Sequence, residues 1–266
     1  MLTLAAASGM LRGASKRIPV GLEMYSVRDR FKTDPEGSLQ AIAKMGYQTV
    51  EIYDVFYSWP VERIKSIRAL LDDLKIACVS THNGASAFMS DGLQKTIDLN
   101  GILGSRLVVM ASSGAKDLDG WKRVAETLAK AGERFAAANL RAGFHNHDKE
   151  FRPLEGTRPI DILAANTPKS VVLQLDVGHC VAGGGDPVAF IHANPGRIRS
   201  LHLKEWSPEK QFEALFGDGI VPWKKVFDAA EKTGGAESYL IEWEGTASPS
   251  FESVEKCLAA YKKIHG

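Results

Sequence analysis

The chain has 266 residues, of which 44% are hydrophobic and 24% are charged, and its formal net charge is +1. The length matches a single TIM barrel, which takes about 250 residues, and the composition is typical of a globular protein with a large core. The balanced charge gives no general attraction to nucleic acid or to an anionic membrane, and no apolar run approaches the ~20 residues of a membrane span. We therefore expect neither nucleic acid nor membrane as a partner. The cysteines, Cys78, Cys180 and Cys257, are too few and scattered for a disulfide framework or a cysteine-based zinc site.

The first 17 residues differ from the rest of the chain. Residues 1–15 are mostly small and apolar, and two basic residues, Lys16 and Arg17, follow them. Such a segment is typical of the remnant of an export signal, and a leader outside the fold is the alternative. We expect a leader over residues 1–17 and one catalytic domain over residues 18–266. The protein is then either cytoplasmic or exported to the periplasm.

From residue 18 onward, short β-rich runs alternate with longer helical patterns. The predicted strands are 18–24, 48–53, 76–81, 106–110, 141–145, 170–176, 198–203 and 238–242. The predicted helices are 35–45, 61–74, 91–103, 118–138, 159–165, 187–193, 222–232 and 251–264. This alternation implies parallel strands that are joined by helices.

The repeated strand and helix pairs predict an α/β protein with a single (β/α)8 TIM barrel. A doubly wound open sheet is the alternative, but it usually has only about five or six strands. Its nucleotide-binding form also needs a glycine-rich turn after the first strand, where this chain has Glu-Met-Tyr-Ser at 23–26. The three glycines at 183–185 follow the sixth strand and are typical of a flexible loop. The barrel is therefore favoured.

Ionisable residues stand where the predicted strands end, which in a TIM barrel is the site of catalysis. Except for the apolar fourth strand, each strand ends at or beside one of them: Glu23, Glu51, His82, His145, Asp176, His202 and Glu242. Charged groups that face a barrel axis cost stability unless they are paired or bound to metal. The pattern therefore indicates a functional site.

The residues that end strands five to eight form one contiguous arc of the barrel. Mixed imidazole and carboxylate ligands suit Mn²⁺, Co²⁺, Zn²⁺ or Fe²⁺, while Mg²⁺ prefers oxygen ligands. We expect one divalent ion of this group, Mg²⁺ included, with four ligands: His145, Asp176, His202 and Glu242. The alternative is a hydrogen-bonded network of the same side chains without a metal.

Fragments around these residues resemble the sugar phosphate isomerase/epimerase superfamily, the xylose isomerase-like TIM barrels. They occur in the family's order and spacing: GLEMYSVRD, GFHNHDKEF, LDVGHC, HLKEW, FGDGIVPWKKVFDAAEKTGG and IEWEG. The resemblance runs from about residue 19 to residue 264. The superfamily also includes inosose dehydratases, tagatose-type epimerases and endonuclease IV.

The resemblance implies the same four ligands and adds roles for other residues. The family usually has Glu, Asp, His and Glu as ligands, so His145 departs from the pattern, and His147 on the same strand face is an alternative ligand. The resemblance implies His179 and Lys204 as groups beside the substrate. We expect three catalytic residues, Glu242, Lys204 and His179, and three substrate-binding residues, Glu51, His82 and His147.

A divalent ion that holds a carbonyl and a neighbouring hydroxyl of a sugar acidifies the C–H bond between them. Removal of that proton gives an enediolate, and its return gives an isomer or an epimer. We therefore expect an isomerase/epimerase-type enzyme that acts on a small sugar or keto-sugar. One alternative is a lyase or dehydratase acting on inosose or 3-keto-sugars, in which a leaving group is expelled from the same intermediate.

Two alternatives come from other classes of protein. A non-catalytic sugar-binding barrel would have no turnover, and a DNA-repair endonuclease is disfavoured by the balanced charge and by the small number of candidate ligands. The expected partner is thus a small carbohydrate. The sequence is equally compatible with a monomer and with a homo-oligomer.

Overall fold

The computed structural model describes residues 17–246 and 249–266, and within them the strands close into a parallel barrel. The predicted leader lies outside the described residues, apart from Arg17. Each strand pairs with its neighbours in the chain, and the last strand pairs with the first. The strands are β1 (Val20–Glu23), β2 (Thr49–Ile52), β3 (Ala77–Asn83), β4 (Leu107–Met110), β5 (Arg141–His145), β6 (Val172–Asp176), β7 (Ser200–Leu203) and β8 (Ser238–Ile241). The predicted (β/α)8 barrel is confirmed.

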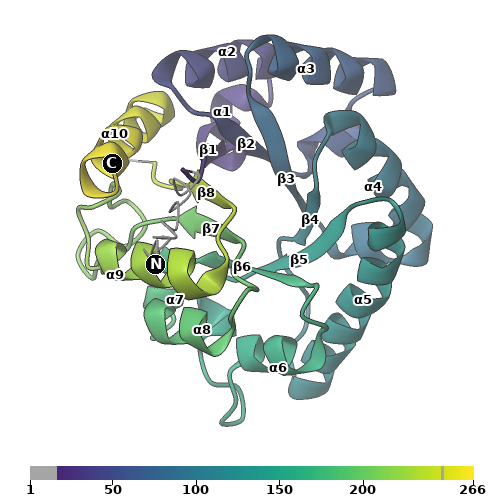
Figure 1. Ribbon diagram of the computed structural model, residues 1–266, viewed down its shortest axis with the longest axis vertical. Coiled ribbons are helices and arrows are strands. Elements are labelled where there is room, and N and C mark those ends of the chain that lie inside the picture. The colour runs from purple at the N-terminus through teal and green to yellow at the C-terminus, as the bar shows by residue number, and fades with distance from the viewer. Residues whose placement is uncertain (1–16, 247–248) are drawn as a thin grey trace, which may run out of the picture.

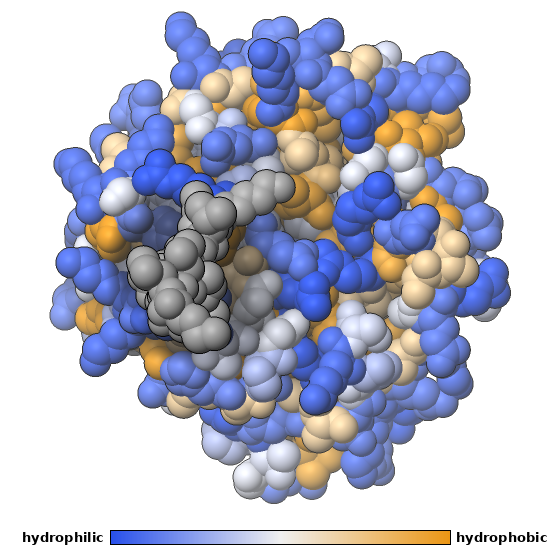
Figure 2. All heavy atoms as spheres, in the orientation of Figure 1, coloured by the Kyte–Doolittle hydropathy of each residue, from blue (hydrophilic) through white to orange (hydrophobic). Residues whose placement is uncertain are grey.

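Helices surround the barrel as an outer ring (Figure 1). The ring contains α2 (Pro35–Met45), α3 (Val61–Asp73), α4 (Ser90–Leu103), α5 (Leu118–Ala137), α6 (Pro159–Asn166), α8 (Pro187–Ala193), α9 (Trp223–Ala229) and α10 (Ser250–Ile264). All of these correspond to predicted helices, although α9 passes into a π-helical turn at Ala230–Gly234 instead of continuing to residue 232. Hydrophilic side chains cover much of the outer surface seen in Figure 2. Among the described residues, no helix has both the length and the apolar character needed to cross a bilayer.

Short helices that the sequence did not predict lie in the loops at the carboxyl ends of the strands. They are α1 (Arg28–Phe31), α7 (Val177–Ala182) and the 3-10 turns Met24–Val27, Asp54–Ser58, Ala85–Phe88 and Asp148–Glu150. These segments are too short for a repeating apolar pattern to reveal them. They form part of the rim above the barrel.

The ends of α2 show how local sequence sets an element. Asp34 caps the helix because its Oδ1 accepts a hydrogen bond of 2.9 Å from the backbone N–H of Gly37, and Pro35 takes the first helical position. The helix ends at Gly46, whose φ of 100° suits glycine. Both boundaries match those of the predicted helix 35–45.

The hydrophobic core has two parts, on the outer and inner sides of the strands. Most core residues, Val108 among them, pack between the strands and the helices. Leu107, Val109 and Val172 form a separate cluster. Because alternate residues of a strand point to opposite faces, Leu107 and Val109 point into the barrel. Farther along the strands, the inward positions are polar, and these residues make up the candidate site.

Candidate metal centre

The carboxyl end of the barrel holds a layer of buried ionisable side chains. Each of the predicted strand-end residues is at most 8% exposed: Glu23, Glu51, His82, His145, Asp176, His202 and Glu242. Such a concentration of buried charge is costly unless the groups compensate one another or bind a cation. Their contacts therefore decide what the site can hold.

The four predicted ligands come together. His145, Asp176, His202 and Glu242 each offer one ligand atom, and these atoms all lie within 4.8 Å of one another. The Nε2 atom of His145 lies 4.0 Å from Oδ2 of Asp176, and Nδ1 of His202 lies 2.6 Å from Oε2 of Glu242. Two imidazoles and two carboxylates match the ligand preferences of Mn²⁺, Fe²⁺, Co²⁺ or Zn²⁺.

One buried oxygen in this group supports the fit to a cation. Oδ2 of Asp176 accepts no hydrogen bond from the described residues, although the ammonium of Lys204 lies 3.4 Å away. The other oxygen, Oδ1, accepts a hydrogen bond of 2.7 Å from the backbone N–H of His179. Asp176 is therefore held in place with one oxygen left for a ligand. The residues present fit a divalent ion.

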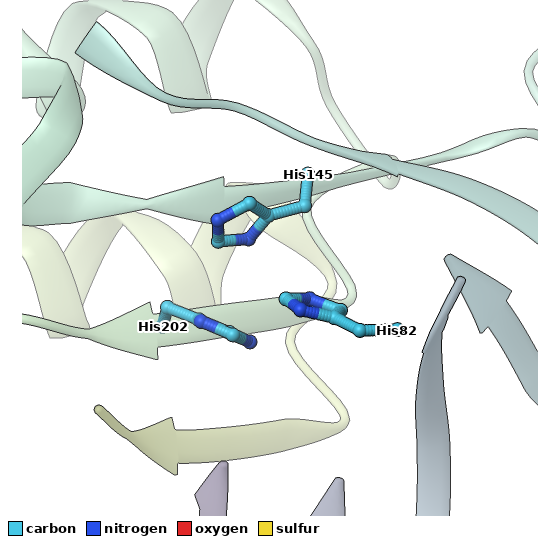
Figure 3. Close-up of side chains that lie close together, drawn as sticks. All are labelled: His82, His145 and His202. Carbon is cyan, nitrogen blue, oxygen red and sulfur yellow. The ribbon is translucent and has the colours of Figure 1, made fainter. Parts of the chain in front are cut away.

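Two other groups of possible metal ligands share residues with these four. His82, His145 and His202 form one, and Glu23, Glu51 and His202 form another. Figure 3 shows the three imidazole rings turned toward one another from three strands, with centroids 4.6 to 5.0 Å apart. His147 belongs to none of the groups found among the described residues. The geometry thus favours His145 over His147 as the ligand from β5.

A second polar layer supports the histidines from below. Oε1 of Glu51 lies 2.6 Å from Nε2 of His202 and 3.0 Å from Nε2 of His82. The side-chain amide of Gln174 donates a hydrogen bond of 2.8 Å to Oε2 of Glu51, and its oxygen lies 3.2 Å from Nδ1 of His145. Sequence reasoning missed Gln174, although its place two residues before Asp176 puts both on the same face of β6.

The charges of this cluster shift the pKa values of its members in opposite directions. Burial disfavours the charged form of His202, but the carboxylates of Glu51 and Glu242 outweigh burial and raise its pKa to about 10. Burial raises the pKa of Asp176 to about 7, against the opposing effect of Lys204. Burial also lowers the pKa of His145 well below its ordinary value. In the absence of a metal, His202 is thus an imidazolium and His145 is neutral.

Lys204 lies in the middle of the carboxylates. Its ammonium is 2.9 Å from Oε2 of Glu244, 3.2 Å from Oε2 of Glu242 and 3.4 Å from Oδ2 of Asp176. Burial disfavours its charge, but these three carboxylates outweigh burial and raise its pKa, so the lysine stays protonated. Lys204 therefore touches two of the candidate ligands.

His179 lies beside this cluster on α7. Its ring nitrogens have no hydrogen-bond partner among the described residues, and burial lowers its pKa to about 2. The ring of Phe212 packs against it with centroids 4.4 Å apart and also lies 5.7 Å from the ammonium of Lys204. The ring of Phe212 therefore covers the site on the side of His179 and Lys204.

The loop that carries Phe212 is fixed by Glu205, which follows Lys204. The carboxylate of Glu205 accepts hydrogen bonds from the indole N–H of Trp223 at 2.6 Å and from the backbone N–H of Gly217 at 3.0 Å. Sequence reasoning missed both Glu205 and Phe212. The HLKEW fragment marks the position of Glu205, but Phe212 lies in an irregular loop with no periodic signal.

A pocket of about 250 Å³ opens above the candidate ligands. Its lining includes His82, His145, His147 and Glu242 of the predicted site, and Tyr25, Tyr53, Asp54 and Glu244, which were not predicted. Glu51 and Lys204 are not part of the lining and are almost fully buried. Burial lowers the pKa of His147 to about 4, so its ring is neutral at pH 7. The pocket thus joins a cluster of candidate metal ligands to the neutral imidazole of His147 and to aromatic rings.

Comparison with known proteins finds a family that matches most of the chain. The model of the xylose isomerase-like TIM barrel family matches residues 39–263. A solved structure of a sugar phosphate isomerase/epimerase from Parabacteroides distasonis superposes with a TM-score of 0.79 at 25% identity. The superposition covers 94% of this chain and 97% of that one.

The curated relatives match over shorter stretches. The inosose dehydratase of Lacticaseibacillus casei is 26% identical over 144 residues, which are 47% of this chain and 48% of the relative. An L-ribulose-5-phosphate 3-epimerase of Shigella flexneri is 32% identical over 84 residues, which are 31% of this chain and 30% of the relative. The chain thus spans about half the length or less of these curated relatives.

Proposed function

Because the chain belongs to the xylose isomerase-like TIM barrel family, we propose that it is a divalent-metal-dependent isomerase/epimerase-type enzyme acting on a small sugar or keto-sugar. The observation that carries this proposal is the group of four candidate ligands within 4.8 Å of one another beneath a pocket. The pocket volume of about 250 Å³ is below the ~300–1,000 Å³ of most ligand pockets, which favours a substrate of one sugar unit.

His145, Asp176, His202 and Glu242 would hold the ion. When bound, it would polarise a carbonyl and an adjacent hydroxyl of the sugar and so favour an enediolate. Glu242 lines the pocket, and its position beside Lys204 and His202 lowers its pKa against the effect of burial. Its carboxylate is therefore ionised at pH 7 and suited to take the proton from carbon.

The other residues would manage the substrate's oxygens. Lys204 carries a proton that it can donate to, or share with, an oxygen on which negative charge develops. His179 is neutral, and its ring nitrogens are free of hydrogen bonds to described residues. His82 and His147 line the pocket and are suited to bind hydroxyl groups. This division assigns proton removal to Glu242 and stabilisation of the oxyanion to Lys204.

A lyase or dehydratase is the second candidate. Its support is the similarity to inosose dehydratases, which extends over nearly half of the chain. The same proton removal by Glu242 would then be followed by loss of a hydroxyl or glycosyl group, with Lys204 protonating the departing oxygen and the neutral ring of His179 donating a hydrogen bond to it. The first step of the reaction is common to both candidates.

Metal analysis with paired variants tests the proposal. Purified protein should contain about one divalent ion per chain, and Asp176→Ala and His202→Ala should remove most of it. His145→Ala should also reduce the metal content, whereas His147→Ala, a matched change on the same segment, should retain it. Turnover of a panel of keto-sugars should stop in chelator and return with added Mn²⁺ or Co²⁺. Unchanged metal content in Asp176→Ala and His202→Ala would refute the ligand set.

A further inference from the structure

Glu51 and Gln174 form a pair beneath the candidate ligands that does not reach the pocket. Glu51 is 0% exposed and Gln174 is 1% exposed, and neither belongs to the pocket lining. Both Glu51 and Gln174 are within hydrogen-bonding distance of histidine ring nitrogens: Glu51 contacts His202 and His82, and Gln174 contacts His145 and His82. The pair therefore contacts the candidate ligands from the side opposite the substrate.

The hydrogen bonds of this pair have a fixed direction. A carboxylate only accepts hydrogen bonds, so the amide nitrogen of Gln174, 2.8 Å from Oε2 of Glu51, must be the donor. The same amide nitrogen donates to the hydroxyl of Ser200 at 3.0 Å. The amide oxygen of Gln174 consequently points toward His145 and His82 as an acceptor. The orientation of the amide is set by its neighbours on both sides.

These directions determine which ring nitrogen carries hydrogen. Nδ1 of His145 lies 3.2 Å from the acceptor oxygen of Gln174, so it carries the hydrogen and leaves Nε2 facing Asp176. Nε2 of His202 lies 2.6 Å from Oε1 of Glu51 and Nδ1 lies 2.6 Å from Oε2 of Glu242, so both nitrogens of the metal-free imidazolium carry hydrogen. An ion that took Glu242 as a ligand would replace the hydrogen on Nδ1, while the hydrogen on Nε2 would stay directed at Glu51. In both rings, the nitrogen that faces the other candidate ligands is the one left for a metal.

We propose that Glu51 and Gln174 are positioning residues that select the metal-facing nitrogen of His202 and of His145. The inference rests on the proposed metal site and goes beyond it, because it gives Glu51 a role other than contact with substrate. A partner that accepts the second N–H of a metal-bound histidine fixes the ring and makes it a better ligand, and loss of such a partner typically weakens metal binding about 10- to 100-fold.

The test compares metal affinity, stoichiometry and histidine tautomers in four variants. Glu51→Gln weakens the acceptor, Glu51→Asp keeps its charge but withdraws it by one methylene group, and Gln174→Met removes the acceptor of His145. Glu150→Gln is the matched control, because Glu150 is also a fully buried carboxyl, but it accepts its hydrogen bond from the backbone N–H of His147 and belongs to none of the candidate metal groups found among the described residues. Circular dichroism identifies variants that fold, and chelator competition measures their affinity.

The Glu51 and Gln174 variants should bind Zn²⁺ or Co²⁺ about 10- to 100-fold more weakly. Glu150→Gln should bind like wild type. In wild-type protein loaded with Zn²⁺, nitrogen-15 NMR should find N–H groups at Nε2 of His202 and Nδ1 of His145, and Glu51→Asp should disturb the first of them. Wild-type affinity in both Glu51 variants would overturn the inference.

Stoichiometry separates this inference from two other outcomes. If wild-type protein binds two ions per chain and Glu51→Gln binds one, Glu51 is itself a ligand and the positioning role is wrong. If wild-type protein binds no ion, the proposed function fails, and this inference fails with it. A wild type that binds one ion, with wild-type affinity in both Glu51 variants, refutes only the positioning role.

Discussion

Replacement of Lys204 by methionine should destabilise the metal-free protein strongly. Lys204 is 1% exposed, and its ammonium lies within 3.4 Å of the carboxylates of Glu244, Glu242 and Asp176. Lys204→Met keeps most of the side-chain volume but leaves these carboxylates without their shared cation. Loss of one partner of a buried ion pair costs about 3–5 kcal/mol. We expect a fall of this size in the free energy of unfolding when a chelator is present.

A bound divalent ion should offset part of that loss, because it would neutralise the same Asp176 and Glu242 carboxylates. By thermodynamic linkage, the part of the lost unfolding free energy that the ion recovers appears as tighter metal binding. Each ~1.4 kcal/mol recovered raises the metal affinity about tenfold. Lys204→Met should therefore bind metal at least about tenfold more tightly than wild type if the ion recovers ~1.4 kcal/mol or more. Its kcat should nevertheless fall steeply, because the proposed proton donor is gone.

Urea unfolding in chelator and in saturating Mn²⁺, together with chelator competition, measures both effects. Lys232→Met is the matched control: its ammonium also lies 2.9 Å from a carboxylate, that of Asp228, but the side chain is 73% exposed. An exposed pair contributes only about 0–1 kcal/mol, so this control should change little. Metal content that falls in parallel with activity in Lys204→Met would show that the lysine holds the ligands in place, and would refute this reasoning.

Two further predictions concern protons and the wall of the site. The metal-free pKa of His202 is about 10 and that of Asp176 about 7, so metal binding should release about one proton between pH 7 and 10 and about two below pH 7. Metal affinity therefore falls as the pH falls. Calorimetry in buffers of different ionisation enthalpy counts the released protons, and a count independent of pH would contradict the pKa values assigned to His202 and Asp176. Phe212→Ala uncovers His179 and should lower kcat/KM by about tenfold or more, the equivalent of ~1.4 kcal/mol, without changing metal content. Equal loss of metal and activity would instead assign Phe212 to folding of the site.

The fold and the grouping of the four candidate ligands were predictable from the sequence because each has a local signature. The alternation of short β-rich runs with helical patterns defines the elements. The rule that barrel strands end at the active site then brings Asp176, His202 and Glu242 together before any contact is known. The pairing of Glu51 with His202 was not predictable, since 151 residues separate them and only barrel closure makes them neighbours. Gln174 escaped attention because a neutral amide among hydrophobic residues carries no chemical signal of its own.

The last prediction concerns the outcome of the reaction. Symmetric epimerisation needs a base on each face of the sugar, and the proposed strand-five ligand is His145 instead of a carboxylate. Its Nε2 faces the candidate metal site and its Nδ1 contacts Gln174, so neither nitrogen is left to move a proton. Glu150 does not replace it, because this side chain is 0% exposed and its Oε2 accepts a hydrogen bond of 2.8 Å from the backbone N–H of His147.

In the proposed mechanism Glu242 is then the dominant base, Lys204 is the acid that would protonate oxygen, and the neutral ring of His179 would donate a hydrogen bond. In D₂O, we expect exchange of one specific C–H of a keto-sugar together with formation of an isomerised or eliminated product. Glu242→Gln should abolish the exchange even when excess metal restores full occupancy, which separates loss of the base from loss of a ligand. Glu150→Gln is the matched control and should exchange at the wild-type rate. Rapid, reversible epimerisation of a free ketose at C3 as the sole reaction would show that a second base exists and that this interpretation of His145 is wrong.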